Sequence, residues 1–305
     1  MKAIHLFIIV LLLSFACADK KSTSEQSTDK SAEVSKQTTG SSTTVELTLA
    51  WQTDTLLTTC EAALYDADSE LIYVANINQN PWGEDGNGFI STLATDGTIK
   101  ELKWVTGLDG PKGMGIANGK LYVADIDELV EIDIAQQKIS NRYVAGDSVR
   151  LNDVTVDADG NVYASGTQSG KVYQLRDGTI TAHSEEAYGG LNGLLYQEEG
   201  IYFANFPKAT FGIYRPGSPK FDILTTAIGQ GDGIIRLKNG DFITSSWGGE
   251  LYYIQQSDWS QRRILDTKAQ KIGAADLGYI PDQDLVIVPT FFHNRVMAYK
   301  VSVKQ

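Results

Sequence analysis

Several short apolar segments begin with a polar residue. Three of these polar residues follow one another at intervals of about 40 positions. Asn152, Asn192 and Asp232 form this series, and Glu61 holds the same place before an earlier apolar segment. Carboxylate and carboxamide oxygens suit a hard cation, with water completing the shell. If the fold brings them together, we expect one divalent ion there, Ca²⁺ first, with Mg²⁺, Mn²⁺ or Zn²⁺ also acceptable.

Histidine and cysteine do not offer an alternative metal site. The three His residues are His5, His183 and His293, and the two Cys residues are Cys17 and Cys60, so no pair has zinc-site spacing. Only Cys60 remains after Cys17, so we expect no disulfide within the mature domain. Cys60 lies at the start of an apolar strand, where we expect a small core residue and not a nucleophile.

The segments that carry the polar residues are copies of one pattern. Each has a small or polar head, an apolar strand, a turn rich in Asp, Asn or Gly, a second apolar strand and a further strand. Such units, repeated about every 40 residues, are typical of a β-propeller, whose sheets cover one another's faces around a ring. The sequence therefore predicts an all-β fold of six four-stranded antiparallel blades. The units start near Glu61, Gly113, Asn152, Asn192, Asp232 and Ala274.

The two ends of the repeated region support six blades. The last unit offers three strands, and Val45–Trp51, which precedes the first unit, is a candidate for the missing fourth. We expect this N-terminal strand to close the ring, so that the propeller spans residues 45–305. The heads of the innermost strands converge on the axis of a propeller, and this would bring the four polar heads together.

Four stretches at the blade heads carry a family resemblance: Glu61-Ala-Ala-Leu-Tyr-Asp66, Arg150-Leu-Asn-Asp153, Leu191-Asn-Gly-Leu194 and Asp232-Gly233. In type, order and spacing they resemble the motifs of the senescence marker protein/gluconolactonase family, the regucalcin-like six-bladed propellers that include metal-dependent lactonases. The resemblance covers roughly Glu61 to Tyr299. Two departures stand out: Ala63 replaces a proline of the family, and the second unit looks like a generic structural repeat.

The resemblance implies a metal-dependent hydrolase of a sugar lactone or related ester. It implies a divalent ion at the top of the channel, bound by Glu61, Asn192 and Asp232, and substrate contacts from Arg150 and Asn152. The ion would polarise the lactone carbonyl and activate a water, with Asp232 as the base. The planar fork of donors on Arg150 could anchor a carboxylate, phosphate or hydroxyl group of the substrate.

Each motif also has a structural interpretation. Asn-Gly and Asp-Gly are frequent in turns, and Asn152-Asp153 could be an ordinary strand start. A carboxylate such as Glu61, next to an apolar strand, is costly to bury unless it is paired or bound to metal. The alternative function is a non-catalytic binding propeller with a structural metal or none, because fold alone does not fix function.

Aromatic residues outside the motifs leave two further expectations. Trp82 lies in a Gly-rich insert, Gln79–Gly88, and is either a lid over a pocket or an anchor for its loop. Trp247, Tyr252 and Tyr253 are expected in the core between blades. The turn between the last two strands, His293–Arg295, is expected to be structural.

Composition and the first residues bear on location. The formal charge of −12 and the pI of about 4.7 argue against binding nucleic acid or an anionic membrane surface. Residues 1–17 resemble a bacterial lipoprotein signal, with an apolar core and Ala16 before Cys17. We expect a lipid on Cys17 to anchor the protein at the cell envelope, and residues 18–44 to form a polar tether. Secretion after cleavage near Ala16 or Ala18 is the alternative. A small molecule is the expected ligand, and no protein partner is indicated.

Overall fold

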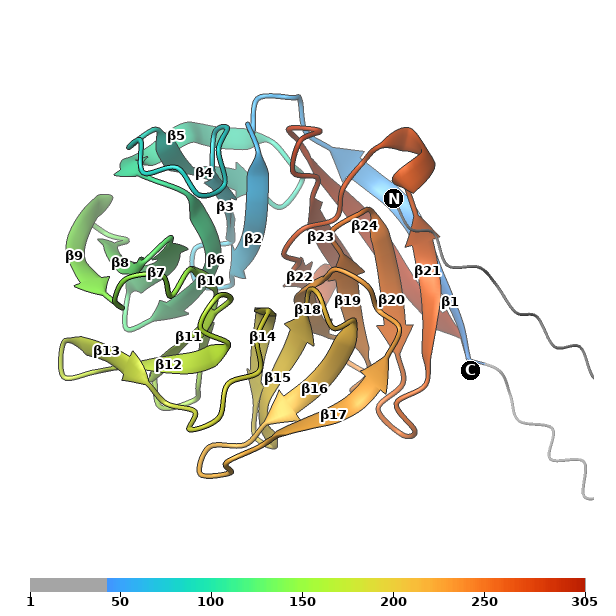
Figure 1. The fold of residues 1–305 in the computed structure, drawn as a ribbon. Coiled ribbons are helices and arrows are strands. Elements are labelled where there is room, and N and C mark those ends of the chain that lie inside the picture. The colour runs from blue at the N-terminus through green and yellow to red at the C-terminus, as the bar shows by residue number, and fades with distance from the viewer. Residues whose placement is uncertain (1–42, 305) are drawn as a thin grey trace, which may run out of the picture. The chain divides into compact units, whose positions relative to one another are not determined.

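Successive segments of the chain pair as antiparallel β-strands, four to a sheet. The computed structural model describes residues 43–304. Six such sheets stand as blades around a common axis (Figure 1). The predicted six-bladed all-β propeller is therefore confirmed. The expected signal with Cys17 and nearly all of the tether lie outside the described residues. Within residues 43–304, no helix is long and apolar enough to cross a membrane.

The blades follow one another along the chain. Blade 1 contains β2 (Cys60–Asp66), β3 (Leu71–Asn76), β4 (Gly88–Ala94) and β5 (Ile99–Leu108). Blade 2 contains β6 (Pro111–Ala117), β7 (Lys120–Asp125), β8 (Glu128–Asp133) and β9 (Lys138–Val144). Blade 3 contains β10 (Leu151–Val156), β11 (Val162–Gly166), β12 (Lys171–Arg176) and β13 (Thr179–Ala182).

Blades 4 to 6 repeat the arrangement. Blade 4 contains β14 (Leu191–Gln197), β15 (Gly200–Asn205), β16 (Thr210–Tyr214) and β17 (Phe221–Thr226). Blade 5 contains β18 (Gly231–Arg236), β19 (Phe242–Ser246), β20 (Glu250–Ile254) and β21 (Gln261–Asp266). Blade 6 contains β22 (Gly278–Ile280), β23 (Leu285–Pro289), β24 (Val296–Lys304) and β1 (Thr44–Gln52). Two short 3₁₀ turns, η1 (Lys268–Gln270) and η2 (Pro281–Gln283), flank β22.

The ring is closed by the N-terminal strand, as expected. β1 pairs antiparallel with β24 along its whole length, with Thr44 opposite Lys304 and Gln52 opposite Met297. Each end of β1 extends one residue beyond the predicted Val45–Trp51. Blade 6 is thus made from the two ends of the propeller, and its two outer strands hold the ring together.

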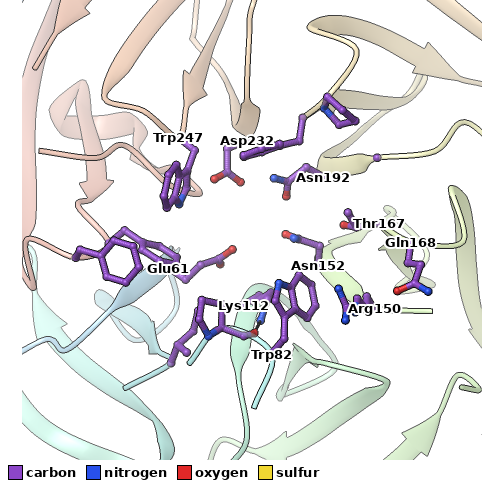
Figure 2. Close-up of a pocket in the computed structure, with 17 residues that line it drawn as sticks. Glu61, Trp82, Lys112, Arg150, Asn152, Thr167, Gln168, Asn192, Asp232 and Trp247 are labelled. Carbon is purple, nitrogen blue, oxygen red and sulfur yellow. Dashed lines mark hydrogen bonds between the residues drawn. The ribbon is translucent and has the colours of Figure 1, made fainter. Parts of the chain in front are cut away.

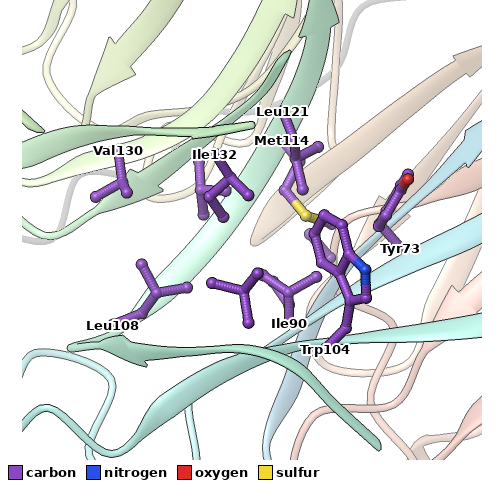
Figure 3. Close-up of a cluster of buried hydrophobic side chains, with 12 residues drawn as sticks. Tyr73, Ile90, Trp104, Leu108, Met114, Leu121, Val130 and Ile132 are labelled. Atoms are coloured by element: carbon purple, nitrogen blue, oxygen red, sulfur yellow. The ribbon is translucent and has the colours of Figure 1, made fainter. Parts of the chain in front are cut away.

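The hydrophobic core is divided into layers between neighbouring blades, because a single four-stranded sheet has two apolar faces to cover. Each of the six interfaces holds a cluster of buried side chains. Between blades 1 and 2, Tyr73 and Trp104 pack with ring centroids 4.9 Å apart beside Met114 (Figure 3). Cys60 is fully buried between blades 6 and 1, and burial raises the pKa of its thiol to about 11. It is a core residue, as predicted.

Candidate functional site

The first strand of each blade lies nearest the axis (Figure 1), and in five blades its pairing with the second strand shifts register near its start. A β-bulge of this kind leaves extra residues outside the regular ladder and re-aims their side chains. The bulges therefore explain why the polar heads point into the channel. The residues at the shifts are Glu61, Lys112-Gly113, Asn152-Asp153, Asn192-Gly193 and Asp232-Gly233.

The turn interpretation of Asn-Gly and Asp-Gly is wrong here. Asn192-Gly193 lies inside β14 and Asp232-Gly233 inside β18. The glycines are needed because inner strands of neighbouring blades approach closely at the axis. A Cβ atom at Gly193 would overlap the backbone carbonyl oxygen of Asp232, and one at Gly233 would overlap the backbone nitrogen of Leu277.

The polar heads surround a cavity of about 620 Å³ at one end of the channel. All five residues expected to bind metal or substrate line it: Glu61, Arg150, Asn152, Asn192 and Asp232. Figure 2 shows the head groups of the two acids and the two amides directed toward the same space from four blades. Residues that are far apart in sequence thus form one site.

Three of these residues carry an oxygen atom that is suited to a ligand. Glu61 Oε2, Asn192 Oδ1 and Asp232 Oδ1 are buried and have no hydrogen-bond partner among residues 43–304. Glu61 and Asp232 are only 4% and 2% exposed. Buried polar atoms normally have a hydrogen-bond partner. Three buried oxygen atoms without one, around the same cavity, therefore indicate that the cavity binds a ligand. Two carboxylates and a carboxamide fit a hard cation such as Ca²⁺.

The fit depends on the carboxamide as well as on the acids. Within the described part of the chain, no group of three or more His, Cys, Asp and Glu side chains is arranged to hold a metal ion. The predicted set contains only two acids, Glu61 and Asp232, and it is completed by Asn192. Water molecules would have to supply the remaining ligands of a six- to eight-coordinate ion.

The acids at the site repel one another. Burial, followed by the charge of Asp232, raises the pKa of Glu61 well above its ordinary range, while Lys112 opposes the shift. Burial and the charge of Asp153 raise the pKa of Asp232 in the same way, with Asn192 and Lys112 acting against it. The protein therefore does not supply enough positive charge to balance the two carboxylates. A divalent cation would supply the positive charge that the site lacks.

Two further acids, Asp153 and Asp276, lie deeper in the channel, and neither was expected to bind metal or substrate. Asp153 accepts hydrogen bonds from the backbone N–H groups of Val154 (2.6 Å) and Leu194 (2.5 Å), and burial raises its pKa to about 7. Asp276, before β22, has a pKa raised by burial and then by Asp153. Both line a second cavity, of about 280 Å³, formed by later residues of the inner strands. The bond to Leu194 joins blade 3 to blade 4.

Lys112 lines the same cavity but had no predicted role, because the second unit resembles a generic structural repeat. Lys112 is 2% exposed, and its ammonium group donates to the carbonyl oxygens of Pro81 and Gly110, both at 2.7 Å. Burial lowers its pKa to about 8, although the charge of Glu61 opposes the shift. A signal was available, since Lys112-Gly113 stands at the same blade position as Asn192-Gly193.

Trp82 anchors its loop and also forms part of the cavity wall. Its ring lies 4.3 Å from Lys112 Nζ and 5.0 Å from the centre of the Arg150 guanidinium, measured to the ring centroid, and it lines the cavity (Figure 2). These cation–π contacts hold the insert Gln79–Gly88 against the cavity. The ring is thus an anchor for its loop and a wall of the pocket.

The two expected substrate contacts have free hydrogen-bonding groups. Arg150 has a left-handed backbone with φ of 53°, held by a 2.8 Å bond from its N–H to Asp127 Oδ1. Within residues 43–304, neither the Arg150 guanidinium nor the Asn152 carboxamide makes a hydrogen bond or an ion pair. Both groups line the cavity, so their donors are available to a ligand.

Four aromatic residues form the opposite side of the cavity, and we call them the aromatic wall: Phe206, Trp247, Phe291 and Phe292. The expectation that Trp247 belongs to the core between blades holds only in part, because Trp247 packs against the buried Ile77, Ala275 and Phe291 but also lines the cavity. Trp247 follows β19 directly and contacts Phe206, Phe291 and Phe292 through tilted or edge-on rings. Tyr253 does lie in the core, between blades 5 and 6, and Tyr252 packs in the core between blades 4 and 5.

Comparison with solved structures identifies the same architecture. A gluconolactonase of Xanthomonas campestris aligns with a TM-score of 0.61 and 16% identity, over 80% of this chain and 86% of that chain. A streptogramin B lyase (TM-score 0.60, 12% identity, 86% and 98%) and a luciferin-regenerating enzyme (0.60, 15%, 86% and 97%) align equally well. These similarities show the fold alone. No protein-family model matches the sequence, and no curated protein matches it.

Proposed function

We propose that this propeller is a metal-dependent hydrolase of lactones or related esters. The observation that carries the proposal is the set of three buried, unpartnered oxygen atoms, Glu61 Oε2, Asn192 Oδ1 and Asp232 Oδ1, around one cavity. These residues would hold one divalent ion, Ca²⁺ first. The solved gluconolactonase with the same fold supports the choice of lactones. When bound, the ion would polarise a carbonyl group and lower the pKa of a water.

The protein's own groups account for the other parts of the reaction. Asp232 lines the cavity, so its carboxylate would take the proton of a water held there. Arg150 and Asn152 have free donors on the same cavity and would orient the substrate. Lys112 adds positive charge near Glu61 and Asp232, where negative charge accumulates during the reaction.

The proposed reaction is balanced with water as the only co-reactant. The oxygen of a water bonds to the lactone carbonyl carbon while Asp232 takes the proton of that water. The ring C–O bond then breaks, and Asp232 returns the proton to the departing alkoxide. The product is the open hydroxy acid. Holding the water, base and carbonyl in one cavity provides the usual benefit of orientation.

The test combines metal analysis with turnover on the soluble domain, residues 43–305. We expect about one divalent ion per chain, hydrolysis of at least one member of a lactone panel, and loss of hydrolysis on chelation that re-addition of the ion reverses. Undiminished hydrolysis by metal-free protein would refute the proposal. Ion binding that raises the melting temperature without any hydrolysis would favour the non-catalytic binding propeller instead.

A further inference from the structure

The two sides of the cavity differ in chemistry, and the difference follows the blades. Thr167 and Gln168, directly after β11 of blade 3, are polar and lie near Arg150. The residues directly after β15 and β19 are Phe206 and Trp247, and Phe291 follows β23 after one residue. This position in the repeat is thus polar in blade 3 and aromatic in blades 4 and 5, and in blade 6 the aromatic residue stands one position later. Figure 2 shows Trp247 and Arg150 on opposite sides of the cavity.

The aromatic wall is continuous and leaves apolar surface open to the cavity. Ring centroids of Trp247 and Phe291 are 5.2 Å apart, and those of Phe291 and Phe292 are 4.7 Å apart. Phe292 is nevertheless 64% exposed, the largest exposure of any Phe, Tyr or Trp in the described part of the chain. Its ring contacts those of Trp247 and Phe291 and lines the cavity. A ligand with an apolar group in the cavity would cover part of its exposed surface.

We infer that the substrate is a lactone or ester with an apolar alkyl or aryl substituent, bound against the aromatic wall, and not a small polyhydroxylated sugar lactone. The inference rests on the proposed function. A hydroxyl-rich ring would place polar groups against Phe206, Trp247, Phe291 and Phe292, which offer few partners, and desolvating unpaired hydroxyls is unfavourable. The cavity of about 620 Å³ also has the size of pockets that enclose drug-sized ligands.

The substrate would therefore bind in one orientation. Its carbonyl would lie at the polar end of the cavity beside Glu61 and Asp232, and its apolar substituent would extend along the aromatic wall. The free guanidinium of Arg150, on the far side, would select against the reversed orientation, because an apolar chain there would desolvate an unpaired charge.

The experiment measures kcat/KM on γ-lactones of increasing side-chain length, from γ-butyrolactone to γ-nonalactone, beside glucono-1,5-lactone. We expect kcat/KM to rise about threefold to fourfold per methylene over the first few methylenes, the factor that corresponds to about 0.8 kcal/mol. Phe292→Ala should flatten this rise and Phe292→Leu should restore part of it. Val144→Ala, an exposed apolar residue outside the cavity, is the matched control and should leave the rise unchanged.

Binding of γ-lactams with the same side chains, followed by tryptophan fluorescence, separates the two proposals because lactams resist hydrolysis. Affinity that grows with chain length, together with no turnover of any lactone, would refute the hydrolase and uphold the apolar ligand class. Turnover that is greatest for gluconolactone and independent of chain length would overturn the inference while the hydrolase stands. A rise in kcat/KM that Phe292→Ala leaves intact would also overturn it.

Discussion

The α-carbon of Gly193 packs so closely against the carbonyl oxygen of Asp232 that no larger residue fits between blades 4 and 5 at the axis. This contact joins the bulge that carries Asn192 to the bulge that carries Asp232. It sets the spacing of Asn192 Oδ1 and Asp232 Oδ1, which face the same cavity and accept no hydrogen bond among residues 43–304. The glycine therefore acts on the site through backbone geometry.

Gly193→Ala should destabilise the fold and displace the site. The added methyl group meets backbone and not a flexible side chain, so the expected loss in free energy of unfolding is roughly 3 kcal/mol, at the upper end of overpacking costs. Denaturant unfolding measures it. Gly189→Ala is the control, because a Cβ atom there meets nothing within 4 Å. Equal stability of the two variants would contradict the close-approach argument.

Glu61→Gln should abolish binding of the divalent ion while preserving the fold. Loss of a residue that only hydrogen-bonds to a metal ligand costs up to about 100-fold in activity. Removing a ligand itself should therefore lower kcat/KM by at least that factor. Calorimetric titration with Ca²⁺ and turnover test this. In chelated protein the variant should be no less stable than wild type, since burial and Asp232 already disfavour the Glu61 carboxylate. Glu198→Gln, on an exposed turn, is the matched control. Tight Ca²⁺ binding by Glu61→Gln would exclude this ligand set.

Lys112→Met should loosen the insert Gln79–Gly88. The change leaves the carbonyl oxygens of Pro81 and Gly110 without their donor and removes the cation from the Trp82 ring. An unsatisfied buried acceptor costs about 1–3 kcal/mol, so we expect a lower melting temperature and faster proteolysis within the insert. Lys220→Met, at an exposed lysine, should change neither. Unchanged proteolysis in Lys112→Met would show that the insert is held by other contacts.

Glu250→Gln should make stability less dependent on acid pH. Burial alone would raise the pKa of Glu250, but hydrogen bonds from Lys268 and Arg263 lower it overall. A lowered folded-state pKa stabilises the protein above the unfolded-state value, near 4.5, and this contribution disappears as the pH falls through the folded-state pKa.

We therefore expect Glu250→Gln to cost about 1–2 kcal/mol at pH 7 and close to nothing at pH 2, measured by urea unfolding. The figure is modest because Arg263 and Lys268 are about half exposed and solvent screens them. Asp68→Asn, at an exposed acid, is the control. A stability difference between wild type and Glu250→Gln that grows as the pH falls would contradict the prediction.

The repeat pattern in the sequence was enough to predict the blades. Alternation of apolar and polar residues fixes which face of a strand is buried, and turns rich in Asp, Asn and Gly separate the strands. Six copies of this local pattern predicted six sheets, and three strands in the last copy predicted closure by the residues around Val45–Trp51. These features are local, so they can be read along the chain.

Only some of the residues of the site could be predicted from the sequence. Glu61, Asn192 and Asp232 could be grouped because repeats put them at equivalent positions, and convergence at the axis follows from the fold. Lys112 occupies an equivalent position, but its unit resembles a generic structural repeat, and a lysine next to apolar residues gives no sign of which carbonyl groups will accept its hydrogen bonds. Those acceptors, Pro81 and Gly110, come from a loop and a turn whose course is set by packing.

Only the tertiary structure decided the shape and polarity of the cavity. Phe206, Trp247 and Phe291 lie in different blades, and nothing in the local sequence of any one of them indicates that their rings meet. Likewise, Asn192-Gly193 has the sequence of a turn, and it lies in a strand because the neighbouring blade needs room for its backbone. The sequence by itself determined the strands and their number. The contacts between blades, such as the one that brings Gly193 against the backbone of Asp232, determined which side chains share a site.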